Sequence, residues 1–317
     1  MLRLLLLNRR KYLLIAGIVS VIITIGQLWQ TVKQEERLYV SKTARLFNDD
    51  NVNSATFVTA LYDIKRDKWP RFERKFEQYL QYFKNFLNLR TNLVMFSEKS
   101  TLDQMRLTFG HLLQPNVYPI IQRWVDIEYQ KYRQNVTQVM DSEEFKKDNK
   151  LLKSKIPEAF SVDYVLLMNN KLSFLKEAID INPFNSTHFF WIDAGFGHGN
   201  KTIFPSTNNT WKPSKLLSLN NFITYIMLLK NPFIYKGHED NLHKLPLNPV
   251  LNGAFFGGDK NAVLEYYHLY YIVFRDYLDN HHVVDDDQSL AIFCFYKNPK
   301  LFNLVLGGWY DVFKLFS

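Results

Sequence analysis

The chain has 317 residues, of which 47% are hydrophobic and 16% aromatic, and its formal net charge is +8. This composition fits a folded domain that is large enough to bury its own core. Residues 1–11 hold four of the 39 basic side chains and none of the 31 acidic ones, so the remainder is only mildly basic. Its charge is too weak and too scattered for a nucleic-acid-binding surface.

The N-terminal segment predicts a membrane anchor. Residues 12–29 carry no charged side chain, and as a helix they would span about 27 Å, the thickness of a thin bilayer. The basic residues before this segment predict a cytosolic tail at residues 1–11. A cleaved signal peptide is the alternative, but no small-x-small cleavage site follows the apolar core. We expect a single-pass type II membrane protein of the Golgi or endoplasmic reticulum, with a stem at residues 30–53 and a lumenal body at 54–317.

Four Asn-x-Ser/Thr sequons permit a lumenal body without establishing one, at Asn135, Asn185, Asn200 and Asn208. A glycan on Asn200 would crowd the candidate site described below, so we expect glycosylation at the other three asparagines. Cys294 is the only cysteine, so the body has no internal disulfide and depends on its core. Cys294 lies in an apolar stretch and is predicted to be buried.

Strand and helix patterns alternate from the start of the body. Residues 55–62 and 92–97 are predicted strands, rich in β-branched and aromatic residues. Between them, residues 71–89 carry apolar residues at helical spacing, which predicts an amphipathic helix. Residues 101–153 have a helical pattern apart from breaks around residues 115–119.

The second half of the body continues this alternation. Residues 163–181 are predicted to form one helix that ends before Pro183, and an apolar strand follows that ends at Asp193. Residues 216–229 are predicted to be helical, and residues 250–258 form an apolar strand bounded by glycines. The order of strands and helices predicts an α/β domain with a mostly parallel central sheet flanked by helices.

The segment at residues 189–199 carries the strongest candidate site. Four apolar residues lead directly into Asp193, and Gly195, Gly197 and Gly199 follow. A continuous apolar run is typical of a buried parallel strand, and open α/β sheets bind ligands at the carboxyl ends of such strands. Asp193 is therefore predicted to hold a ribose, a sugar hydroxyl or a metal ion. The alternative is an acid that caps a turn.

Two further clusters carry candidate chemistry. Asp286 and Asp287 precede an apolar helical stretch, so one of them is predicted to be its N-cap. As adjacent carboxylates they also suit a hydroxyl-rich ligand or the role of a base. Gly253 and Gly257 indicate close approach of backbone to another group, and the alternative is a hairpin or a bulge.

Two polar loops have a weaker signal. His238, Glu239, Asp240 and His243 are residue types that bind metals, but their hydrophilic loop favours a solvated surface. Asp63 and Arg66 follow the first predicted strand and could meet a nucleotide, although a solvated loop predicts the same composition.

The order of these features resembles that of the GT-A nucleotide-sugar glycosyltransferases. More closely, residues 56–63, 191–195 and 252–258 are similar to segments of the HtrL/YibB family, and the resemblance spans about residues 54–310. In GT-A enzymes an Asp-x-Asp motif at the end of the central strand holds a divalent metal and the donor diphosphate. Here the matching stretch, residues 193–195, lacks the second acid. The resemblance thus implies either Mn²⁺ or Mg²⁺ on Asp193 with His198 or His238, or metal independence.

The resemblance implies a transferase that moves a sugar from a nucleotide-sugar donor to a hydroxyl of a glycan or glycoconjugate. Asp193 and Gly195 would then hold the donor sugar, ribose or metal, and Asp287, with Asp286, would orient or deprotonate the acceptor. The expected donor contacts are made by Thr59, Tyr62, Asp63, Arg66, Lys171, Gly253 and Gly257. The alternative is a non-catalytic lumenal module that binds glycans or a partner enzyme, and Gly195 in place of an acid favours it.

Overall fold

The computed structural model describes residues 54–317 except 90, 111–115, 206–210, 212 and 246–247. The expected tail, anchor and stem at residues 1–53 and the sequon at Asn208 lie outside the described residues. Within that described part, every helix is too short or too polar to cross a bilayer.

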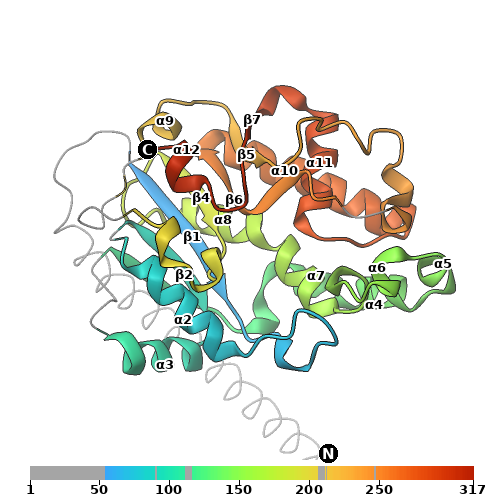
Figure 1. Ribbon diagram of the computed structural model, residues 1–317, viewed down its shortest axis with the longest axis horizontal. Coiled ribbons are helices and arrows are strands. Elements are labelled where there is room, and N and C mark those ends of the chain that lie inside the picture. Colours follow the sequence, from blue (N-terminus) through green and yellow to red (C-terminus); the bar gives the residue numbers. More distant parts are fainter. Residues whose placement is uncertain (1–53, 90, 111–115, 206–210, 212, 246–247) are drawn as a thin grey trace, which may run out of the picture. The chain divides into compact units, whose positions relative to one another are not determined.

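The body is a mixed α/β domain built on one seven-stranded sheet, with the order β3-β2-β1-β4-β6-β5-β7. The strands β1, β2, β4 and β5 are parallel to one another, as are β3 and β7 to their neighbours, whereas β6 runs antiparallel to β4 and β5 (Figure 1). Their bounds are β1 Ala55–Leu61, β2 Leu93–Ser97, β3 Val117–Ile121, β4 His188–Ile192, β5 Ile223–Met227, β6 Leu251–Asp259 and β7 Phe302–Leu306.

Helices cover both faces of this sheet because side chains along a strand point alternately to either side. Phe189 and Trp191 of β4 face one apolar cluster, which includes residues of α7, α8, α10 and α11. Phe190 and Ile192 face a second cluster, which includes residues of α2, α3 and α12. The main helices are α2 Phe76–Leu87, α3 Lys99–Phe109, α4 Arg133–Asp141, α7 Val162–Asn169, α8 Lys171–Ile181, α10 Lys260–Asp276 and α11 Asp287–Lys297.

Short helices complete the connections, namely α5 Glu143–Lys146, α6 Lys150–Lys153, α9 Ser214–Leu217 and α12 Val312–Leu315. Cys294 lies in α11 and is buried and free, as predicted. The α/β class and the strands predicted at residues 55–62, 92–97 and 250–258 are confirmed. Four of the predicted boundaries or types are wrong.

The helix predicted at residues 216–229 is instead α9 followed by β5. Where a break in a helical region was predicted, Val117–Ile121 form β3, an edge strand that tolerates Pro119 because one side of it needs no partner. The single helix predicted at residues 163–181 is two, α7 and α8, which break at Asn170. The helix predicted from residue 71 begins only at Phe76, since Phe72 has a left-handed φ of 58°.

Candidate functional site

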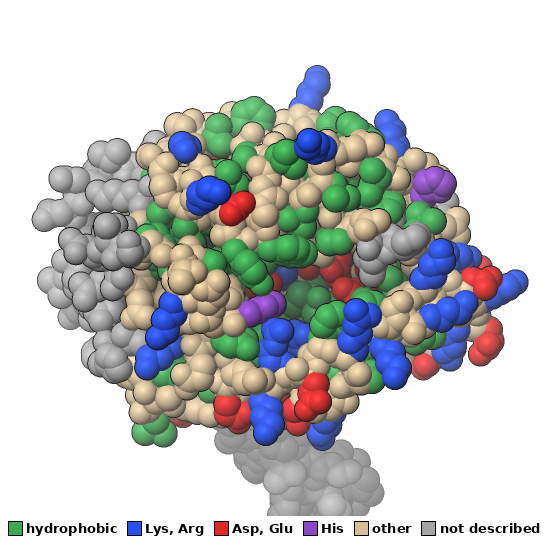
Figure 2. All heavy atoms as spheres, viewed as in Figure 1, with side chains coloured by type: hydrophobic (Ala, Val, Ile, Leu, Met, Phe, Trp, Pro, Cys, Tyr) green, Lys and Arg blue, Asp and Glu red, His purple; other side chains and the backbone are tan. Residues whose placement is uncertain are grey.

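A cavity of about 380 Å³ opens at the carboxyl ends of β1 and β4. Tyr62, Asp63 and Arg66 line it from the loop after β1, and Asp193 and the turn after it line it from β4. The strands that follow β1 in the chain, β2 and β3, extend the sheet on one side of β1, whereas β4 pairs with β1 on its other side, so the strand order reverses between β1 and β4. This is the switch point at which open α/β sheets bind ligands. Figure 2 shows this hollowed face, with acidic side chains at the bottom of the hollow and basic ones around it.

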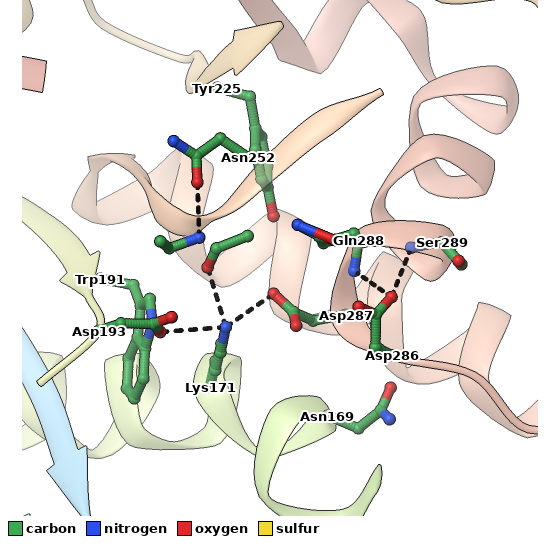
Figure 3. A network of polar contacts seen from close by, with 12 residues as sticks. Asn169, Lys171, Trp191, Asp193, Tyr225, Asn252, Asp286, Asp287, Gln288 and Ser289 are labelled. Carbon is green, nitrogen blue, oxygen red and sulfur yellow. Dashed lines mark hydrogen bonds and ion pairs between the residues drawn. The ribbon is translucent and has the colours of Figure 1, made fainter. Parts of the chain in front are cut away.

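A buried lysine lies beneath this cavity. The Lys171 ammonium is 3.2 Å from Asp193 Oδ1 and 3.0 Å from Asp287 Oδ2, and it donates to the Gly253 carbonyl at 2.9 Å (Figure 3). The side chains of Lys171 and Asp287 are 3% and 5% exposed, whereas that of Asp193 is 37% exposed. Asp193 is therefore the member of this group that faces the cavity, and Asp287 is shielded behind the lysine.

Three elements bring this group together. Lys171 is the first residue of α8, Asp193 directly follows β4, and Asp287 is the first residue of α11. Asn169, at the break between α7 and α8, donates to the Asp285 carbonyl at 2.9 Å. The break in the helix thus fixes Lys171 relative to the start of α11. The Trp191 indole N–H donates to Asp193 Oδ1 at 2.7 Å and holds this carboxylate from a further side.

The charges in this group stabilise one another. Burial alone would lower the pKa of Lys171, but the carboxylates of Asp193 and Asp287 outweigh it and raise that pKa, so the ammonium stays charged. Burial raises the pKa of Asp287 to about 7, although the Lys171 charge partly opposes the shift. Asp287 therefore titrates near neutral pH while Lys171 remains a cation.

Asp286 is the N-cap of α11, as predicted, since its Oδ1 accepts the N–H groups of Gln288 at 3.0 Å and Ser289 at 3.1 Å. Burial, and then the neighbouring Asp285, raise the pKa of Asp286 to about 6. Neither Asp286 nor Asp287 is among the residues that line the cavity. Asp287 reaches the site through Lys171, and its predicted contact with an acceptor is not part of this arrangement.

The close approach expected at the glycines is present, but the approaching groups belong to the protein. A Cβ on Gly253 would lie 2.5 Å from Asp287 Oδ2, and one on Gly257 would lie 2.2 Å from the Phe189 carbonyl oxygen. Gly253 and Gly257 therefore make room for α11 and β4, and neither lines the cavity. Gly195 does line it, and a Cβ there would lie 2.9 Å from the Tyr79 ring.

The other predicted donor contacts divide into two groups. Tyr62 lines the cavity, and its hydroxyl donates to Gln122 at 3.3 Å. Asp63 lines it too and forms an ion pair with Lys65. Thr59 is fully buried within β1 and is absent from the cavity wall. Lys171 is also absent from that wall.

The two candidate metal-binding histidines lie in different places. His198 lines the cavity with Asp193, and its Nδ1 lies 3.2 Å from the Tyr310 hydroxyl. His238 is exposed and outside the cavity wall. Across the described residues, no cluster of three or more His, Cys, Asp or Glu side chains could hold a metal ion. Asp193 Oδ1 also already accepts from an indole and faces an ammonium, so this donor set does not fit a divalent cation.

The sequence model of a family described as "Bacterial protein of unknown function (HtrL_YibB)" matches residues 53–317. The chain belongs to the HtrL/YibB family. It is also similar to Protein HtrL of Escherichia coli (strain K12), with 25% identity over 280 residues that cover 83% of this chain and 93% of the relative.

In this HtrL/YibB member, sequence reasoning missed several cavity residues. Arg74 comes from the loop just before α2, Tyr79 comes from the first turn of α2, and Trp309 and Tyr310 come from the loop after β7. Arg71 and Arg74 both follow Arg66 within eight residues, so the local sequence does not distinguish Arg74, which lines the cavity, from Arg71, which does not. Trp309 and Tyr310 had no local signal either, because the local sequence does not show which loop folds over the edge of the sheet.

The described sequons are all exposed. Asn135 lies on α4, and Asn185 lies just before β4, at the opposite end of that strand from Asp193. Asn200 follows the turn that lines the cavity, and its side chain accepts the Thr202 N–H at 2.9 Å. A glycan on Asn185 would therefore leave the cavity open.

Proposed function

We propose that this member of the HtrL/YibB family is a glycosyltransferase with a GT-A-like domain. It would move a sugar from a nucleotide-sugar donor to a hydroxyl of a glycan or glycoconjugate. The observation that carries the proposal is the cavity at the β1–β4 switch point with the Asp193 carboxylate in its wall. This pairs the usual ligand position of an open α/β sheet with an acceptor for sugar hydroxyls.

The chemistry of the walls supports a nucleotide sugar. Tyr62, Tyr79 and Trp191 offer aromatic surface for a base or a sugar ring. Arg66 offers charge for phosphate, and Asp193 accepts hydrogen bonds from sugar or ribose hydroxyls. Because Trp191 and Lys171 both hold Asp193 Oδ1, this carboxylate is oriented before any ligand binds.

In this transfer Asp193 and Asp287 have different roles. The acceptor hydroxyl attacks the anomeric carbon, and the bond from that carbon to the donor phosphate oxygen breaks. The nucleoside diphosphate leaves with the bonding electrons, and the hydroxyl proton passes to the leaving phosphate or to solvent. Asp193 orients the donor in the cavity. Asp287 acts through Lys171 as a positioning residue, because it is buried behind that side chain.

A thermal-shift panel with UDP-, GDP- and CMP-sugars tests this proposal. A ligand at about 100 times its Kd should stabilise the folded chain by about 2.7 kcal/mol. Transfer is then assayed with the donor that shifts the melting temperature. If no nucleotide sugar stabilises the chain, the glycosyltransferase proposal fails.

The second candidate is a non-catalytic module that binds glycans or a partner enzyme. The packing of Gly195 favours it, because the Tyr79 ring occupies the space that a second acid would need. Such a module would be stabilised by free glycans and not by nucleotide sugars, and the same assay distinguishes the two.

We further propose the secretory pathway as its location, with residues 12–29 as the anchor and the body in the lumen. The exposed sequons at Asn135 and Asn185 support this proposal. Removal of N-glycans should increase gel mobility of the expressed chain. Digestion of the body by a protease added outside sealed microsomes would contradict a lumenal location.

A further inference from the structure

Two arginines meet at one phenol oxygen in the cavity wall. The Arg66 guanidinium donates to the Tyr79 hydroxyl oxygen and, at 3.2 Å, to the Phe72 carbonyl. The Arg74 guanidinium donates to the same hydroxyl oxygen at 3.4 Å. The Arg74 backbone N–H also donates to the Arg66 carbonyl at 3.2 Å, which closes the loop that carries both residues. Arg66, Arg74 and Tyr79 all line the cavity.

Within the described residues, no carboxylate lies within ion-pair distance of either guanidinium. The two carboxylates in the cavity wall are engaged elsewhere, since Asp63 pairs with Lys65 and Asp193 pairs with Lys171. Burial raises the pKa of Tyr79 despite the two arginines, so the phenol stays neutral and supplies no counter-charge. The pair therefore leaves two positive charges without a counter-ion in the cavity wall.

The pair also has unused hydrogen-bonding capacity. A guanidinium has five N–H donors in a planar fork. Arg66 Nε is buried and has no acceptor among the described residues. A buried donor without an acceptor is rare in folded proteins and points to a missing ligand atom. Planar donors of this kind match the paired oxygens of a phosphate group.

We infer that Arg66 and Arg74 form a subsite for a diphosphate anion, which they bind without a divalent metal. Its assignment to the leaving diphosphate of a nucleotide sugar rests on the proposed function. The subsite takes the place of the donor contact that the resemblance implies for Lys171. The Lys171 ammonium has three N–H donors and three acceptors around it, so it has none left for a phosphate.

Titration calorimetry of the full chain with inorganic pyrophosphate in EDTA tests the subsite. Pyrophosphate should bind, and rising salt should weaken it. Arg66→Gln and Arg74→Gln should each raise its Kd about tenfold or more, because each removes a charged hydrogen-bond donor. Arg71→Gln is the matched control in the same loop, since Arg71 donates to the Ser154 carbonyl at 2.9 Å and does not line the cavity.

Arg66 also packs over the Trp69 ring at 4.6 Å, so its substitution risks the local fold. Arg74→Gln is the safer variant, because Arg74 contacts only Tyr79 and Tyr82 through its guanidinium in the described structure. The inference is overturned if pyrophosphate does not bind, if it binds only with Mn²⁺, or if Arg74→Gln binds it as tightly as the unmodified chain. A chain that binds pyrophosphate but binds none of the nucleotide sugars would refute the glycosyltransferase proposal and leave the subsite intact.

Discussion

Asp193 connects the buried lysine to the cavity at the scale of single residues. One of its oxygens accepts from Trp191 and lies beside Lys171, while about a third of its side chain is exposed. A ligand that binds Asp193 therefore meets a carboxylate whose orientation and charge are fixed from below. Asp193 is therefore the residue that recognises the ligand, and Trp191 and Lys171 hold its carboxylate in place.

Asp193→Asn should separate recognition from folding. The variant keeps the size of the side chain and an oxygen for the Trp191 N–H, and Lys171 keeps Asp287, so the fold should persist. Donor affinity should fall by about one to two decades, because a charged hydrogen bond contributes about 1.5–3 kcal/mol. Ligand titration measures the change, with Asp180→Asn on the exposed face of α8 as the control. Unchanged donor affinity in Asp193→Asn would remove this residue from the site.

Asp287 should make the stability of the chain depend on pH near neutrality. Its pKa is about 7 in the folded state against an ordinary value of 3.8, so its contribution to stability is complete below about pH 4 and is lost as pH rises through 7. The amide of the Asp287→Asn variant does not titrate, so the stability of this variant relative to the unmodified chain should increase with pH. The expected slope is at most about 1.4 kcal/mol per pH unit.

Urea unfolding of both chains between pH 5 and pH 8 measures this difference, and the titration of groups distant from Asp287 cancels in the comparison. A relative stability of Asp287→Asn that stays constant across this range would show that Asp287 is ionised throughout it and that the prediction is wrong.

The break between α7 and α8 decides the geometry of the site at the scale of elements. Asn169 is buried, donates to the Val165 and Asp285 carbonyls at 2.8 and 2.9 Å, and accepts from the Tyr270 hydroxyl at 2.6 Å. A side chain from the break thus links α7, α10 and the start of α11. These bonds make two helices more favourable here than the continuous one.

Asn169→Leu should destabilise the chain, because it leaves the Asp285 carbonyl and the Tyr270 hydroxyl buried and unpaired. Each such group costs about 1–3 kcal/mol. Asn280→Leu is the control, since Asn280 is exposed and surface changes usually stay within about 0.5 kcal/mol. Chemical denaturation gives both values, and equal stability of the two variants would show that the links from Asn169 are unimportant.

Local pattern predicted the elements that are buried on both faces or amphipathic. The strands β1 and β2 were predicted from their β-branched and aromatic residues, β4 and β6 from apolar runs, and α2 from its spacing. The helix predicted at residues 216–229 was wrong, because a short apolar run has no decisive period and β5 gains its partners from β6 and β7, which lie later in the chain. The break at Asn170 depends on partners about 40 to 115 residues away, which no local pattern records.

The candidate site was predicted by position more than by contact. The resemblance assigned residues after β1 and β4 to one donor site, and both segments line the same cavity. The sequence also singled out Lys171, Asp193 and Asp287. That Lys171 lies between the two acids depends on how α8 and α11 pack on the sheet, and this required the structure.

The positive charges around the candidate site come from distant parts of the described body. Lys171 lies beside the acid that the GT-A resemblance assigns to a metal, and two further cations line the same cavity. Donor binding should therefore survive EDTA, because fixed side chains supply the positive charge. Donor titration before and after chelation measures this. Stoichiometric Mn²⁺ retained through dialysis, or donor binding abolished by EDTA, would contradict it.

The position of β6 also has a consequence for synthesis of the chain on the ribosome. β4 is buried on both faces and pairs with β1 along one edge. Its other edge has no partner until β6 has been synthesised. The start of β6 follows the end of β4 by about 60 residues, which at about 5–20 residues per second takes about 3–12 s. Throughout that interval the nascent chain presents an unpaired apolar edge that another chain can extend. Binding of a chaperone to this edge, or its pairing with a strand of another chain, would therefore occur before the candidate site has formed.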